Sequence, residues 1–97
     1  MWLRGYAPNA AGDSLHISMD DQPTTVLTGF APRQWSWANH NQLQSGAVTF
    51  AITQPGIHTL HLWQREDGFK LDRILLTTDD NYTPIENGPE ESEYIDN

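Results

Sequence analysis

Apolar residues recur at every second position along much of the chain, which is the repeat of a β-strand. In the clearest case Leu15, Ile17 and Met19 alternate with polar residues, so one face of that strand is expected to be buried. The same reading predicts strands at residues 2–6, 25–28, 47–53, 58–63 and 72–76. No segment carries apolar residues convincingly at helical spacing, and the pattern therefore predicts an all-β protein.

Turn-forming residues separate these strands, at positions 8–13, 20–23, 54–56 and 66–70. The connections at 54–56 and 66–70 have the length of hairpins, and Asp67-Gly68 is a favoured hairpin turn. Short, evenly spaced strands of this kind are typical of an antiparallel β-sandwich or barrel. We expect one domain over residues 1–84, followed by an acidic tail or linker over 85–97.

Residues 29–46 show little periodicity and are predicted to form a long loop, a kind of segment that is often functional. Trp35 and Trp37 project to the same side if this stretch is extended. An indole stacks on the apolar face of a sugar ring, and an amide such as that of Asn39 exchanges hydrogen bonds with sugar hydroxyls. All three residues are therefore candidate ligand contacts, although at least one tryptophan is expected in the core.

Trp63 is the second candidate contact. Leu60 and Leu62 are expected to face the core from its predicted strand, which leaves Trp63 on the other side. Trp63 and His61 then lie on the outer face, where an exposed aromatic side chain usually marks a binding surface. The alternative is that a loop or the tail covers the indole. Its expected neighbours on this face are His61, His16 and Arg4.

Asp72 shares the predicted core-facing side of its strand with Ile74. A carboxylate in that position needs a partner, which is an arginine, a set of backbone donors or a cation. Asp72 is therefore also the candidate ligand of a calcium ion bound by oxygen atoms.

Charge along the chain is divided unevenly. The 97 residues carry a net charge of −8. Residues 79–97 hold seven of the 13 acidic residues and no Lys or Arg, whereas residues 1–78 hold six acids against five bases. A near-neutral body with an acidic tail argues against binding nucleic acid or an anionic membrane and suits a neutral ligand. No apolar run is long enough to span a membrane.

Catalytic motifs are not evident in the sequence. There is no cysteine, no glycine-rich phosphate loop and no Gly-x-Ser-x-Gly segment. A glycosidase needs two carboxylates on either side of one bond, and the adjacent Glu66 and Asp67 do not meet this requirement. We therefore assign no catalytic residue, and a small hydrolase is the least favoured reading.

Four segments resemble carbohydrate-binding jelly-roll modules of polysaccharide-degrading enzymes, of the galactose-binding-like and malectin-like type. They are residues 2–8, 12–20, 56–60 and 65–77. The resemblance covers most of residues 2–84 and implies a two-sheet β-sandwich, often with structural calcium. It also implies a ligand site at the loops or on a sheet face, with Trp35, Trp37 and Asn39 matching the loop position and Trp63 the face position. The opening Ala-Glu strand of such modules, which helps to hold calcium, has no counterpart.

The favoured function is that of a non-catalytic, secreted glycan-binding module attached to a glycoside hydrolase. Its expected ligand is a neutral plant cell-wall β-glycan such as cellulose, mixed β-glucan, xyloglucan or xylan, bound by exposed tryptophans. We expect a monomer outside the cell, with polysaccharide and the attached catalytic domain as its partners. The alternative is a structural spacer or protein-interaction module that packs on a neighbouring catalytic domain.

Overall fold

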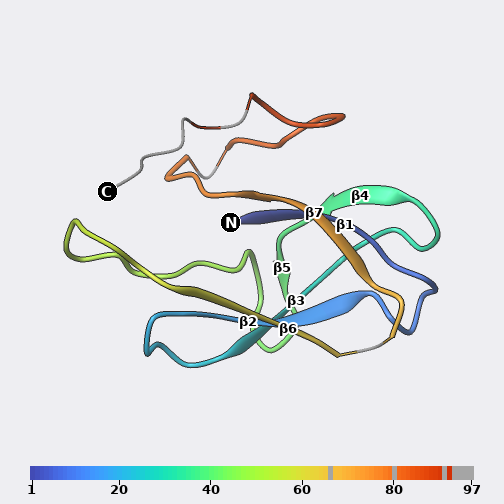
Figure 1. Cartoon of the computed structure of the whole chain (residues 1–97), viewed down its shortest axis with the longest axis horizontal. Coiled ribbons are helices and arrows are strands. Elements are labelled where there is room, and N and C mark those ends of the chain that lie inside the picture. Colours follow the sequence, from blue (N-terminus) through green and yellow to red (C-terminus); the bar gives the residue numbers. More distant parts are fainter. Residues whose placement is uncertain (66, 80, 91, 93–97) are drawn as a thin grey trace.

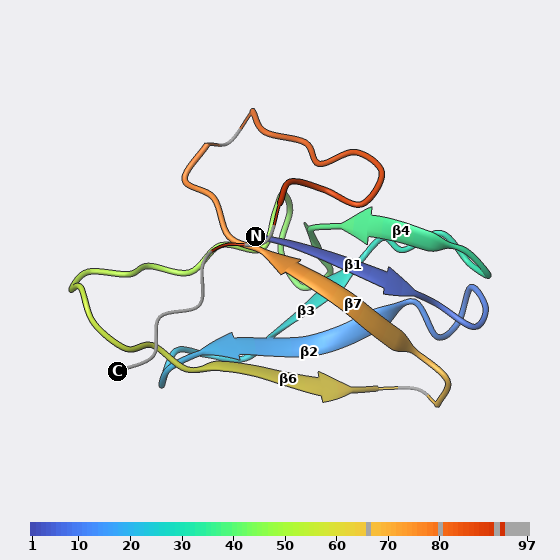
Figure 2. The same cartoon turned by 45° about the horizontal axis from the view of Figure 1, so that its top comes forward.

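The chain folds into two antiparallel sheets packed as a sandwich (Figures 1 and 2). A computed structural model describes residues 1–65, 67–79, 81–90 and 92, and within these ranges every regular element is a strand. One sheet has the order β4 (Trp35–Ala38), β1 (Trp2–Tyr6), β7 (Lys70–Leu75). The other has the order β5 (His40–Asn41), β3 (Thr25–Thr28), β2 (Ser14–Met19), β6 (Leu60–Gln64). The predicted all-β sandwich is thus confirmed.

The core lies between the sheets, where inward side chains of both meet. Leu3 of β1, Ile17 of β2 and Leu27 of β3 are fully buried. The predicted burial of Leu15, Ile17 and Met19 is confirmed, because one face of β2 packs on the opposite sheet while the other faces outward. No helix in the described part of the chain is long and apolar enough to cross a membrane.

The strand predicted at residues 47–53 is wrong. Val48 is fully buried and Phe50 packs against the core, as the alternation indicated, but Ile52 is half exposed. The backbone makes isolated contacts instead of a ladder: Ala47 bridges His40, and the Val48 amide donates to the Asn39 carbonyl at 2.7 Å. Alternation reports that one side of a segment is buried, whereas a strand also needs a neighbouring strand to bond with. The hairpin predicted at 54–56 therefore does not form.

The loop predicted over residues 29–46 is also corrected, because it contains strands β4 and β5. In β4 the large apolar side chains Trp35 and Trp37 face outward, whereas Ser36 and Ala38 face the other sheet. This order reverses the usual hydropathy pattern of a half-buried strand. The period-two signal is consequently hidden in the sequence.

The connection from β6 to β7 passes from one sheet to the other, so the hairpin predicted at 66–70 is wrong (Figure 2). Figure 2 places β6 in one layer with β2, and β7 in the other with β1. Phe69 packs edge-on against Phe30, with 4.8 Å between ring centroids, directly over Gly5. A Cβ atom on Gly5 would lie 2.5 Å from the Phe69 ring, so only glycine fits under this connection.

Candidate functional site

The predicted contact residues divide between two faces that point away from each other. Trp35 and Trp37 lie on the outer face of the sheet that contains β1, and Trp63 and His61 lie on the outer face of the sheet that contains β6. We call the first surface the β1 face; its side chains are Trp2, Arg4, Tyr6, Trp35, Trp37, Lys70, Asp72, Arg73 and Leu75. We call the second surface the β6 face; its side chains are Ser14, His16, Ser18, Val26, His61, Trp63 and Arg65, of which Ser14, Ser18 and Val26 are buried beneath their neighbours.

On the β6 face, the aromatic side chains of Trp63 and His61 lie next to each other. The rings of Trp63 and His61 are nearly parallel, with an interplanar angle of 12° and centroids 5.7 Å apart. Trp63 is 46% exposed, and His16 is directly across from it on β2. The predicted outward placement of Trp63 and His61 is therefore confirmed. The two rings are stacked, so His61 packs against the indole, and the exposed part of Trp63 has an imidazole next to it. Such a combination of apolar ring and polar nitrogens is suited to a ligand ring with polar edges.

The positions directly across from this pair carry no charged side chain, whereas further along the same face the Arg65 Nη1 donates to the Ser14 Oγ at 2.7 Å and to the Gln42 Oε1 at 3.2 Å. The side chains in register with Trp63 and His61 are His16, Ser18 and Val26, and none is an Asp, Glu, Lys or Arg. Arg4, which was expected here, belongs to β1 in the opposite sheet, so that prediction is wrong. The sequence did not show which strands share a sheet, and Arg4 was consequently assigned to the wrong side.

Two cross-strand rows of the β1 face contain Trp35 and Trp37, and the outward pair Trp2 and Leu75 lies beyond them. One row runs Trp35, Tyr6, Lys70 across β4, β1 and β7, and the other runs Trp37, Arg4, Arg73. In the first row Tyr6 meets the Trp35 ring edge-on at 5.7 Å, and the Lys70 ammonium lies 5.3 Å from the Tyr6 centroid. The Arg4 guanidinium carbon lies 5.2 Å from the Trp35 centroid. Trp35 is 42% exposed, so an indole with a fixed cation beside it remains accessible.

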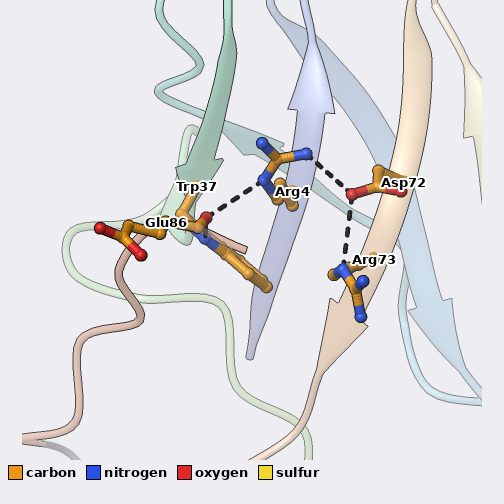
Figure 3. A network of polar contacts seen from close by, with 5 residues as sticks. All are labelled: Arg4, Trp37, Asp72, Arg73 and Glu86. Atoms are coloured by element: carbon orange, nitrogen blue, oxygen red, sulfur yellow. Dashed lines mark hydrogen bonds and ion pairs between the residues drawn. The ribbon is translucent and has the colours of Figure 1, made fainter. Parts of the chain in front are cut away.

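The indole of Trp37 is covered by the chain's own segment around Glu86 and Gly88 (Figure 3). Its Nε1 donates to the Glu86 carbonyl at 2.9 Å, and the Arg4 Nε donates to the same oxygen at 3.2 Å. Gly88 packs on the indole so closely that a Cβ there would lie 2.7 Å from the ring. Part of the predicted 85–97 tail is therefore bound to the sheet. Residues 91 and 93–97 of that tail lie outside the described residues.

Asp72 points outward, so its predicted core-facing position is wrong. β7 pairs Leu71 with Gly5 and Arg73 with Arg4, which leaves Asp72 as an extra residue at a bulge. A bulge of one residue reverses the alternation beyond it, and the sequence pattern does not reveal this. The Asp72 carboxylate accepts a bond of 2.8 Å from the Arg4 Nη1 and lies 3.5 Å from the Arg73 Nε (Figure 3).

The contacts of Asp72 also bear on calcium. Its carboxylate is paired with two guanidinium groups, an arrangement that does not fit a calcium ligand, since calcium takes six to eight oxygen atoms. The described residues contain no group of three or more His, Cys, Asp and Glu side chains placed to hold a metal ion. Calcium binding by this chain stays a prediction.

Asn39 lies between β4 and β5 and is half-buried. Its backbone carbonyl accepts the Val48 amide, which ties the segment after β5 to the end of β4. Sequence reasoning missed Tyr6 and Lys70 as members of the β1 face. The alternation in residues 2–6 does put Arg4 and Tyr6 on one side, but the pairing of β1 with β4 was hidden.

Comparisons with known proteins identify relatives of the chain. Residues 5–91 match the model of the glycosyl hydrolase family 115 C-terminal domain. An uncharacterized protein, P23, from Formosa agariphila is 25% identical over 99 aligned residues, which cover 92% of this chain. The match covers 24% of that protein, so the chain spans about a quarter of its relative's length. No solved structure gives a significant match.

Proposed function

The chain belongs to the glycosyl hydrolase family 115 C-terminal domain family, and on this premise we propose that it is a non-catalytic module that binds carbohydrate. A domain named for its position at the C-terminus of a hydrolase family is an accessory part rather than the catalytic domain. In this role the module holds a polysaccharide outside the cell while an attached hydrolase acts on it.

The parallel pair of Trp63 and His61 on the β6 face is the observation that supports this proposal. A bare indole on the water-facing side of a sheet costs solvation free energy unless a ligand covers it. The pyranose C–H face is apolar and matches the indole plane, and its equatorial hydroxyls reach the imidazole nitrogens of His61 and His16.

The proposed ligand is a neutral β-linked glycan of the plant cell wall, such as cellulose, mixed β-glucan, xyloglucan or xylan. The side chains directly across from Trp63 and His61 are uncharged, and residues 1–78 as a whole are close to neutral, which suits a neutral sugar. The Arg65 guanidinium lies further along the same face, where it bonds to Ser14 and Gln42. Extended β-linked chains present flat sugar faces, which suit an open sheet surface rather than a deep pocket. Affinity per site is expected to be modest, because sugar hydroxyls must be desolvated before they bind.

Affinity electrophoresis on a panel of soluble polysaccharides, with and without a calcium chelator, tests the proposal. Selective retardation by one β-glycan is expected, and Trp63→Ala should lose it while retaining the folded-state circular dichroism spectrum. Ile57→Ala is the matched control, since Ile57 is 91% exposed and lies outside both faces. Equal mobility of the wild type in every polymer, together with no pull-down on insoluble cellulose or xylan, would reject glycan binding.

A protein-interaction role is the second candidate, and a different observation favours it. Leu71, Ile74 and Leu76 in and after β7 are 40%, 46% and 62% exposed. With Met19, Phe50 and Leu60, Leu76 lines an apolar groove between the sheets. Under this alternative the groove packs on a neighbouring domain, and substitutions there, but not at Trp63, would separate the two domains.

A further inference from the structure

The β1 face carries a second accessible indole, on the side of the sandwich opposite Trp63. Trp35 is 42% exposed, nearly as much as Trp63. Its surroundings differ, because Arg4, Tyr6 and Lys70 adjoin it, whereas His61 and His16 adjoin Trp63. The two tryptophans therefore belong to two separate surfaces and not to one extended platform.

The side chains around Trp35 are held in place before any ligand arrives. The Arg4 guanidinium beside the indole is fixed by its bonds to the Asp72 carboxylate and the Glu86 carbonyl. Tyr6 supports the ring edge-on, and Lys70 lies over Tyr6. Side chains that are already ordered lose little conformational entropy on binding. The Arg4 side chain is only 16% exposed, so the exposed Lys70 ammonium is the donor on this surface for sugar oxygens.

The segment around Glu86 and Gly88 limits the size of this surface. It covers Trp37, the other outward indole of β4. Of the two β4 indoles, a sugar on the β1 face therefore meets Trp35, with the row through Tyr6 and Lys70 beside it. This geometry suits one or two sugar units of a longer chain.

We propose that the module is bivalent: Trp35 and Trp63 each bind a β-glycan chain, on opposite faces, so that one molecule joins two polysaccharide chains. The outer faces of a two-sheet sandwich point in opposite directions, and the molecule measures 38 × 29 × 27 Å. A short oligosaccharide on one face cannot reach the other. This inference rests on the proposed glycan binding, but it adds a second site and a cross-linking activity.

The experiment measures stoichiometry with a hexasaccharide cut from whichever polysaccharide gives the strongest retardation. Native mass spectrometry and titration calorimetry should give two hexasaccharides per wild-type molecule. Trp35→Ala and Trp63→Ala should each give one, and the double variant none. The control Ile57→Ala should keep two. Lys70→Ala is a milder second variant, expected to weaken the Trp35 site several-fold without removing a buried contact, since Lys70 is exposed.

Cross-linking is measured independently by the viscosity of the same polysaccharide in dilute solution. The wild type should raise it, whereas each single tryptophan variant should not, although each still binds. A stoichiometry of one that only Trp63→Ala abolishes would overturn bivalency and leave the proposed function intact. A stoichiometry of one that depends on Trp35 alone would overturn bivalency and reassign the glycan site. No binding of any glycan would overturn both.

Discussion

At the scale of single residues, the tryptophans perform different tasks that the sequence does not distinguish. Trp35 and Trp63 remain accessible, whereas Trp37 uses both its N–H group and its ring to hold the C-terminal segment. Indole is suited to this second task because it combines a large apolar body with one hydrogen-bond donor. The neighbour that occupies each ring, and not the residue type, decides its role.

Trp37→Phe should release the segment around Glu86 without unfolding the sandwich. The substitution removes the donor to the Glu86 carbonyl and is expected to cost about 0.5–1.5 kcal/mol of stability. Hydrogen exchange at residues 85–88 should become faster. Trp2→Phe removes an indole N–H from another outward position of the same sheet, and equal effects of the two variants would contradict the assigned role.

A second local feature is the pair of Asp20 and His58. The His58 Nδ1 lies 2.7 Å from the Asp20 carboxylate, and its Nε2 lies 2.8 Å from the Gln54 carbonyl. Both ring nitrogens thus face acceptors, which requires the doubly protonated imidazolium. The hydrogen bond to Asp20, followed by that to Gln54, raises the pKa of His58 above 6.5. The bond from His58, followed by the Thr59 amide, lowers the pKa of Asp20 below 3.8.

Stability should therefore depend on pH through this pair. The contribution of His58 is complete below pH 6.5 and is lost as pH rises through its raised folded-state pKa. The contribution of Asp20 is complete above pH 3.8 and is lost as pH falls through its lowered folded-state pKa. Urea denaturation measures this as the difference in free energy of unfolding between the wild type and His58→Gln. The difference should be largest near pH 5 and smallest near pH 9. A pH-independent difference for His58→Gln would refute the pairing.

At the scale of elements, the sequence predicted a strand best where one face is apolar and buried. β2 met that condition, and its core residues were identified correctly. β4 was missed because its outward residues are the large ones, and residues 47–53 were overpredicted because burial without a pairing partner does not make a strand. The bulge in β7 likewise turned the Asp72 side chain to the face opposite the predicted one. Hydropathy reports burial, whereas strand pairing and register depend on distant segments.

The candidate site was predictable to the same extent. The outward placement of Trp63 and His61 followed from alternation alone, since Leu60 and Leu62 fixed the inner side. The separation of the two tryptophan groups onto opposite faces did not follow, because it depends on the partition of strands between sheets. The cover over Trp37 comes from residues 86–88, about fifty positions away, in a segment without any periodic signal.

Gly5→Ala should destabilise the protein through the connection between the sheets. The new Cβ would meet the Phe69 ring at 2.5 Å and the Lys70 carbonyl at 3.0 Å. Overpacking of this kind costs about 1–3 kcal/mol. A double-mutant cycle with Phe69→Leu tests the cause, because the smaller side chain relieves the ring contact and the two losses should be less than additive. Strict additivity would show that Phe69 is not the obstacle.

At the scale of the whole molecule, burial is unequal across the sandwich. Leu3, Ile17 and Leu27 are fully enclosed, whereas Leu71, Ile74 and Leu76 along β7 remain 40–62% exposed. The groove lined by Met1, Met19, Phe50, Ile52, Leu60 and Leu76 lies on this open side. Stability is therefore expected to come from one part of the interface between the sheets.

Leu76→Ser and Leu3→Ala should differ sharply in how much they lower the free energy of unfolding. Leu3 is fully buried, so its truncation is expected to lose about 2–5 kcal/mol, whereas the exposed Leu76 should change stability by about 0.5 kcal/mol or less. Urea denaturation measures both. Leu76→Ser should also reduce the fluorescence of a dye that binds apolar surfaces. A large stability loss at Leu76 would mean that the groove is closed in solution.

The bulge at Asp72 has a consequence for association between molecules. β7 is the outermost strand of its sheet, and an uninterrupted outer strand is a template on which another chain can add its own backbone. The extra residue breaks the regular spacing of amides and carbonyls, and Lys70 and Arg73 place positive charges along the same strand. A copy approaching β7 therefore meets both a misaligned backbone and charges of its own sign. The bulge at the residue that holds Arg4 in place thus also makes this edge of the sheet a poor template for pairing with another chain.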